Sequence, residues 1–107
     1  MTWRVEVLNE TVATEIEALP EDMQARFLRI GERISTAGLT SLPDALARHL
    51  EGKLWELRLT GRDGIARALY VTASGRRVVV VRVFVKKTQK TPRSEIELAL
   101  TRAKEAI

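Results

Sequence analysis

Three apolar segments separated by two short turns dominate the second half of the chain and constrain its fold. Apolar and polar side chains alternate in "KLWELRLT", residues 53–60, as in a strand with one face in a core. After "GRDG" comes "IARALYVT", residues 65–72, and after "ASGR" comes "RVVVVRVFV", residues 77–85. Turns of this length join antiparallel strands. The sequence therefore predicts a three-stranded antiparallel unit whose nearly all-apolar last strand is central.

The first half of the chain predicts one more strand and two helices. Apolar and charged residues alternate in "WRVEVL", residues 3–8, which is typical of a short strand. Asn9 is a good N-cap for a first helix, and Pro20 ends this helix while suiting the start of a second. The second helix has apolar residues at helical spacing and ends at Gly38. Residues 39–52 predict an irregular connection with one short helical turn.

A last helix follows the strands, with Thr91 as its predicted cap and Pro92 at its first helical position. The order β-α-α-β-β-β-α predicts an α+β fold in which residues 1–107 form one domain. We expect a twisted antiparallel sheet with an N-terminal helical hairpin packed on one face. The C-terminal helix packs either on that face or elsewhere on the sheet.

Composition argues against several kinds of function. The chain has no cysteine and a single histidine, His49, so thiolate sites are impossible, and a histidine-built metal site or a Ser-His-Asp triad is disfavoured. We therefore expect no metal site built on cysteine or histidine. No apolar stretch approaches the roughly 20 residues that cross a membrane, and "MTWRVEVLNE" lacks the apolar core of a signal peptide. The expected location is the cytoplasm.

Basic charge is concentrated in the second half of the chain. Residues 1–52 contain 5 Lys or Arg and 9 Asp or Glu, a net charge of −4. Residues 53–107 contain 13 Lys or Arg and 5 Asp or Glu, a net charge of +8. Such asymmetry is typical of a surface that faces a polyanion, most often nucleic acid. Solvated charge on strand and helix faces is the other interpretation.

The last strand should present basic residues on a face turned away from the helices. Its odd-numbered valines form a purely apolar side, which we expect to face the helices, whereas its even-numbered side carries Arg82, Phe84 and Lys86. If neighbouring strands pair in register, Arg58 shares this basic face. Arg67 alternates with apolar neighbours, so either its face is only half buried there or a bulge redirects it.

The lysines after this strand form a cluster that predicts an anionic partner. Lys86, Lys87 and Lys90 lie just before a predicted helix N-terminus, whose free N–H groups also favour anions. Like charges this close destabilise the fold unless an anion lies among them. With Phe84 and Tyr70 as rings for base stacking, the basic face suits single-stranded RNA. The alternatives are lysines that protect a sheet edge and a tyrosine that belongs to the core.

Three segments carry a family resemblance: "LWELRL" at 54–59, "RALYV" at 67–71 and "FVKKTQKTPRSEIELA" at 84–99. They resemble the phage-derived Gp49-like branch of the RelE/HigB toxin family, in which an LWELR strand precedes an R-x-L-Y strand and an F-x-KKT-x-KTP motif. The resemblance is specific over residues 54–103, and the first half agrees in its order of elements. Relatives often have His-Gly before the Phe. This chain has Arg82 and a valine there, so Arg82 would act as a cation instead of a proton shuttle.

This resemblance implies a toxin of a type II toxin–antitoxin pair. Such toxins enter the ribosomal A site and cleave mRNA there without a metal ion or cofactor. The 2′-hydroxyl attacks the adjacent phosphorus and the 5′-oxygen leaves, which gives a 2′,3′-cyclic phosphate or its hydrolysis product. The implied partners are the ribosome, mRNA and a cognate antitoxin, typically a small helix-turn-helix protein encoded by an adjacent gene. No membrane is involved.

The catalytic residues that the motifs imply are two strand arginines and three lysines: Arg58, Arg67, Lys86, Lys87 and Lys90. Arg67 corresponds to the arginine at the scissile phosphate of relatives, and with one of the twin lysines it would stabilise charge on the phosphorane oxygens. A second lysine, its pKa lowered by neighbouring cations, would accept the proton of the 2′-hydroxyl. Glu56 is either an alternative base or the partner of an arginine. The expected RNA-binding residues are Arg82, Phe84 and Tyr70.

Two other functions stay open at this point. ParE-like relatives share the fold, poison DNA gyrase and cleave nothing, although the KKT-x-KTP motif favours the nuclease branch. The chain is otherwise a non-catalytic RNA-binding relative. Cleavage of an mRNA would distinguish the endonuclease from the gyrase poison and from the non-catalytic relative.

Overall fold

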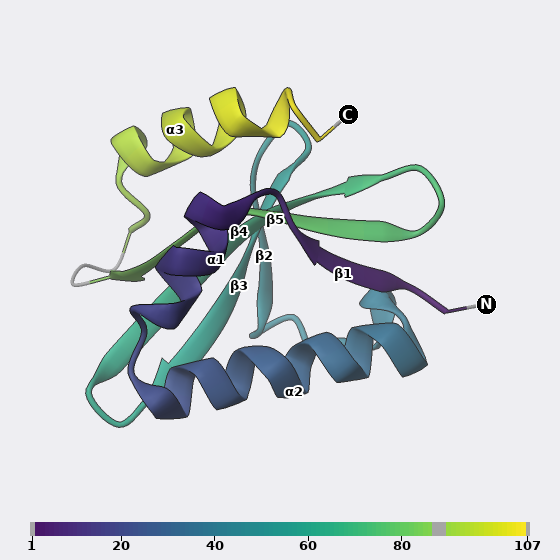
Figure 1. The fold of residues 1–107 in the computed structure, drawn as a ribbon. Coiled ribbons are helices and arrows are strands. Elements are labelled where there is room, and N and C mark those ends of the chain that lie inside the picture. The colour runs from purple at the N-terminus through teal and green to yellow at the C-terminus, as the bar shows by residue number, and fades with distance from the viewer. Residues whose placement is uncertain (1, 87–89, 107) are drawn as a thin grey trace.

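The computed structural model describes residues 2–86 and 90–106, and in them three α-helices pack on a five-stranded sheet (Figure 1). None of these helices is long and apolar enough to cross a membrane. In chain order the elements are β1 (Arg4–Val7), α1 (Glu10–Glu17), α2 (Glu21–Ala37), the 3-10 helix η1 (Leu39–Ser41), β2 (Ala47–Glu51), β3 (Leu54–Gly61), β4 (Gly64–Ala73), β5 (Arg77–Lys86) and α3 (Arg93–Ala103).

The sheet has the strand order β1-β5-β4-β3-β2, and it is mixed where we predicted an antiparallel sheet. The three strands predicted from the short turns, β3 to β5, do pair antiparallel. β1 instead pairs parallel to β5, because a long connection with helices leaves its direction free of any tight turn. The sequence also did not predict β2. This short edge strand lies within the predicted irregular connection and forms by pairing with β3.

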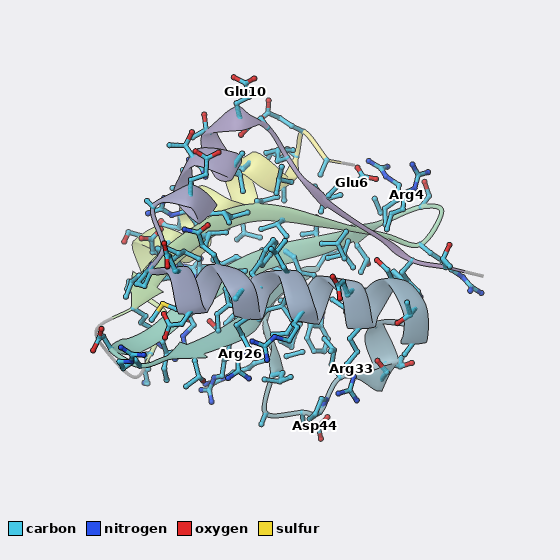
Figure 2. The ribbon with its side chains drawn as sticks, turned by 60° about the horizontal axis from the view of Figure 1, so that its bottom comes forward. Arg4, Glu6, Glu10, Arg26, Arg33 and Asp44 are labelled. Carbon is cyan, nitrogen blue, oxygen red and sulfur yellow. The ribbon has the colours of Figure 1, made fainter. Side chains whose placement is uncertain are left out.

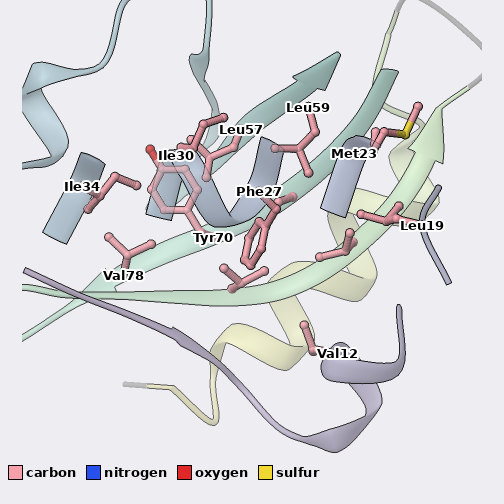
Figure 3. Close-up of a cluster of buried hydrophobic side chains, with 14 of the residues drawn as sticks. Val12, Leu19, Met23, Phe27, Ile30, Ile34, Leu57, Leu59, Tyr70 and Val78 are labelled. Carbon is pink, nitrogen blue, oxygen red and sulfur yellow. The ribbon is translucent and has the colours of Figure 1, made fainter. Parts of the chain in front are cut away.

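Helices cover both faces of the sheet. α1 and α2 pack on one face over a core that includes Phe27 and Ile34 (Figure 3). α3 packs on the other face, where Ala99 and Ala103 contact apolar residues of β3, β4 and β5. The predicted hairpin on one face is therefore confirmed, and the C-terminal helix lies opposite it (Figure 1).

A bulge in β5 breaks the simple alternation that we used to predict its faces. Leu69 pairs with Arg82, but the next residue of β4 pairs with Val80, so Val81 is an extra residue in β5. Val80 and Val83 consequently join the core under α1 and α2, whereas Val81 joins the core under α3. The odd-numbered valines thus do not share one face, and the prediction that they do is wrong.

The ends of the helices follow the sequence signals except at α3. The Asn9 side chain accepts the backbone N–H of Val12 at 3.1 Å, and Gly38 ends α2 with φ +89°. At α3, Pro92 occupies the N-cap position and makes no side-chain cap. Thr91 is not the cap, because its hydroxyl donates a hydrogen bond to β3 instead.

Candidate active site

Among the described residues, basic side chains gather around the carboxylate of Glu56 on the face of the sheet on which α3 packs. Strand pairing aligns Arg48 with Glu56, Arg58 with Arg67, and Ile65 with Lys86, which brings residues from β2, β3, β4 and β5 together. Because cross-strand partners share a face, their charges interact directly. The cation cluster consists of Arg48, Arg58, Arg67 and Lys86, with Glu56 among them.

Arg67 is the most confined member of the cation cluster. Its side chain is 3% exposed, and its Nη1 lies 3.7 Å from Oε2 of Glu56, too far for a hydrogen bond. Its Nε and Nη1 have no hydrogen-bond partner among the described residues. Burial lowers the pKa of Arg67, Glu56 opposes this shift, and Arg58 and Arg48 add to it. Buried cationic donors without acceptors are what an anion-binding site requires.

Lys86 lies beside Arg67 at the end of β5 and is 7% exposed. Burial is the largest cause that lowers the pKa of its ammonium group, followed by repulsion from Arg67, while Glu56 acts in the opposite direction. Both main causes favour the neutral amine, which is the form that accepts a proton. Lys86 is therefore a candidate for the predicted base, with burial acting more strongly on its pKa than the neighbouring cations that the prediction named.

Glu56 is buried to 1% exposure, and its two oxygens contact different elements. Oε1 accepts a hydrogen bond from the Thr91 hydroxyl at 2.6 Å, and Oε2 faces Arg67. Glu56 thus pairs with an arginine, as one of its two predicted roles states. It also holds Thr91, in the segment that leads into α3.

Arg82 and Phe84 lie on the same face, but Arg82 is already paired. Nε and Nη2 of Arg82 donate to the carboxylate of Glu95 at 2.7 and 3.0 Å, and Nη1 lies 2.8 Å from Glu15. The Arg82 guanidinium also lies 5.5 Å from the centroid of the half-buried Phe84 ring. Two carboxylates compensate the charge of Arg82, so it is a weaker candidate for phosphate binding than Arg67.

The structure does not bring Tyr70 to this face. Tyr70 is 1% exposed in the core under α2, and burial raises the pKa of its hydroxyl to about 12 (Figure 3). Its predicted role in base stacking gains no support, and its position fits the alternative role in the core. Lys90 is exposed on the segment before α3, and Lys87 lies outside the described residues.

Sequence reasoning missed Arg48 and left Arg67 undecided. Arg48 was missed because β2 was not predicted, since residues 46–51 show no regular alternation of apolar and polar side chains. Arg67 lies on the face of Leu69, as simple alternation states, and it is buried there instead of half buried. No bulge redirects Arg67, because the extra residue belongs to β5.

The fold of this chain is similar to that of a solved RelE protein. One similar solved structure is the crystal structure of the archaeal RelE-RelB complex from Pyrococcus horikoshii OT3, with a TM-score of 0.55 and 20% identity over 81% of this chain and 98% of that chain. At this identity the likeness concerns the fold. No curated protein matches the sequence.

The family follows from the sequence itself. The model of the family described as phage-derived protein Gp49-like (DUF891) matches residues 14–104. Since this range covers most of the chain, the protein belongs to the phage-derived Gp49-like family of RelE-type toxins. The match extends the resemblance from the second half into α1 and α2.

Proposed function

We propose that the chain is the toxin of a toxin–antitoxin pair and cleaves mRNA on the ribosome, without a metal ion. The observation that carries this proposal is the buried guanidinium of Arg67, whose Nε and Nη1 have no acceptor among the described residues. A phosphate would supply those acceptors and compensate the repulsion within the cation cluster. RNA supplies phosphates together with the 2′-hydroxyl that the reaction needs.

In this reaction one group acts as base, one acts as acid, and the arginines stabilise the transition state. The neutral amine of Lys86 takes the proton of the 2′-hydroxyl, the 2′-oxygen forms a bond to phosphorus, and the bond from phosphorus to the 5′-oxygen breaks. A cationic group of the site gives a proton to the leaving 5′-oxygen. Arg67 stabilises the charge that grows on the non-bridging oxygens, with Arg58 and Arg48 reinforcing the positive potential. The lowered pKa of Lys86 supports its assignment as base.

A cognate antitoxin is the proposed protein partner, and the cytoplasm is the proposed location. The similar archaeal protein is described in complex with RelB, which supports a partner of this kind for a chain with the same fold. A basic face attracts acidic segments of such a partner. A helix-turn-helix antitoxin encoded beside the toxin is the form that the family resemblance implies.

The decisive experiment is cleavage of a defined mRNA with and without programmed ribosomes, mapped by primer extension in the presence of a chelator. We expect cuts in codon register that need ribosomes. Arg67→Ala should lower the cleavage rate by a factor of about 100 or more, because a preorganised donor to the transition state is lost. Lys87→Ala should abolish cleavage as well, as its place in the motif predicts.

The matched control is Arg26→Ala, which removes an exposed arginine of α2, the helix on the other face (Figure 2). It should cleave like the wild type, and circular dichroism should show all variants folded. Full activity of Arg67→Ala would remove the proposed site. Intact message in every condition would leave a gyrase poison or a non-catalytic relative as the function.

A further inference from the structure

We propose that Glu56 and Thr91 are positioning residues that fix the start of α3, and with it Lys90, relative to Arg67. This inference rests on the proposed cleavage of RNA. It concerns neither the proton transfers nor the phosphate contacts themselves. It states how a residue on β3 fixes the segment of the chain that carries Lys90.

The first step is that the two oxygens of the Glu56 carboxylate have different partners. A carboxylate beside an arginine commonly binds it through two parallel hydrogen bonds. Here Oε2 of Glu56 stays 3.7 Å from Nη1 of Arg67, and Oε1 accepts the Thr91 hydroxyl at 2.6 Å. Glu56 therefore leaves Nε and Nη1 of Arg67 unsatisfied while it uses its stronger hydrogen bond elsewhere. Glu56 therefore interacts more closely with Thr91 than with Arg67.

The second step is the place of Thr91 in the chain. Thr91 precedes the N-cap residue Pro92 and follows Lys90 directly, yet it does not cap α3. Its bond to Glu56 joins residues 35 positions apart and links β3 to the start of α3. A hydrogen bond to a buried carboxylate is short and strong, so it defines one geometry.

The third step is a comparison with the polar link made by the first residue of α3. Arg93 pairs with Glu51 of β2, but the two side chains are 61% and 42% exposed. Exposed pairs of this kind hold their geometry weakly. Because Thr91 bonds to a carboxylate that is 1% exposed, its link should hold the segment before α3 more firmly than the Arg93 pair does. Arg93→Ala is therefore a matched control that removes a neighbouring link.

The test compares Thr91→Val, Thr91→Ser and Arg93→Ala in two measurements. The first is hydrogen exchange of the Glu95 and Ile96 amides, which bond to the Pro92 carbonyl in the first turn of α3, measured without RNA. The second is ribosome-dependent cleavage. Thr91→Val should speed exchange and lower kcat about ten- to a hundredfold with little change in KM, because misplacement affects the transition state more than binding. Thr91→Ser keeps the hydroxyl and should restore both, and Arg93→Ala should resemble the wild type.

The two measurements separate failure of this inference from failure of the proposed function. Unchanged amide exchange in Thr91→Val, or loss of activity in Thr91→Ser equal to that in Thr91→Val, would overturn the positioning role. Faster exchange in Thr91→Val beside a wild type that cleaves no message would instead show that the proposed function is wrong. The positioning role would then fall with that function.

Discussion

Burial of Arg67 and Lys86 costs folding free energy, because each charge loses water and faces other cations. Glu56 opposes this cost at both groups, because its negative charge favours their charged forms. A chain selected for stability alone would place apolar side chains at such positions. The cost is understandable if an anion binds there, since the same groups then become partners.

The lowered pKa of Lys86 makes a prediction about stability and pH. Below its folded-state pKa, Lys86 is protonated in both states, and its charge destabilises the fold. Between that pKa and the ordinary value of about 10.4, the folded protein releases the proton first, so stability rises with pH. Lys86→Met should not show this rise. The free energy of unfolding of the wild type, measured relative to that of the variant, should therefore increase with pH across this window.

Urea unfolding of both proteins at a series of pH values measures this difference. Each pH needs the pair of proteins, because Tyr70, with a pKa raised to about 12, destabilises the fold as pH rises from 10. That loss is common to wild type and variant and cancels in the comparison. If the difference between the free energies of unfolding of wild type and variant stays constant with pH, the pKa of Lys86 is not lowered in the folded protein.

At the scale of elements, the bulge in β5 decides which face each of its side chains joins. Beyond Val80 the edge of β5 is no longer paired with β1, and side chains of two helices contact its backbone there. Glu15 of α1 accepts the N–H of Val83 at 3.0 Å, and Arg102 of α3 donates to the carbonyl of Val81 at 3.0 Å. Glu15 also pairs with Arg102 and with Arg82.

Glu15→Ala should therefore lower the free energy of unfolding by about 2 to 4 kcal/mol. The variant leaves a strand N–H without its acceptor and removes the shared partner of two largely buried arginines. Glu17→Ala is the matched control, because Glu17 is exposed on the same helix, and it should stay within about 0.5 kcal/mol of the wild type. Equal stability of the two variants in chemical unfolding would contradict this role of Glu15.

The same element shows how far the sequence predicts this fold. Tight turns and apolar periods predicted β3, β4, β5 and the helices, because these signals are local. The bulge at Val81 was not predictable, since four consecutive valines suit either face and only contacts with α1 and α3 select the register. Of the cation cluster, Arg58, Arg67 and Lys86 were named from the motifs, whereas Arg48 was not, because its strand is set by pairing with β3.

At the scale of the whole molecule, the basic charge of the second half is compensated unevenly. Arg93 pairs with Glu51 and Glu97, Arg77 pairs with Glu6, and the pair Arg82 and Arg102 shares Glu15. In the cation cluster Glu56 opposes the mutual repulsion of Arg67, Lys86 and their neighbouring arginines. Compared with these paired arginines, positive charge is therefore focused on the cation cluster.

This focusing predicts how RNA binding responds to salt. For single-stranded RNA, each phosphate that a cation neutralises contributes about 0.7 to the slope of log affinity against log salt concentration. Arg67→Ala should reduce the slope by about that amount, whereas Arg93→Ala should leave it unchanged, because Glu51 and Glu97 already compensate Arg93. Fluorescence anisotropy with an oligonucleotide that carries 2′-O-methyl groups measures binding without cleavage. Equal reductions of the slope in both variants would mean that RNA contacts basic charge generally, and that the cation cluster is not its binding site.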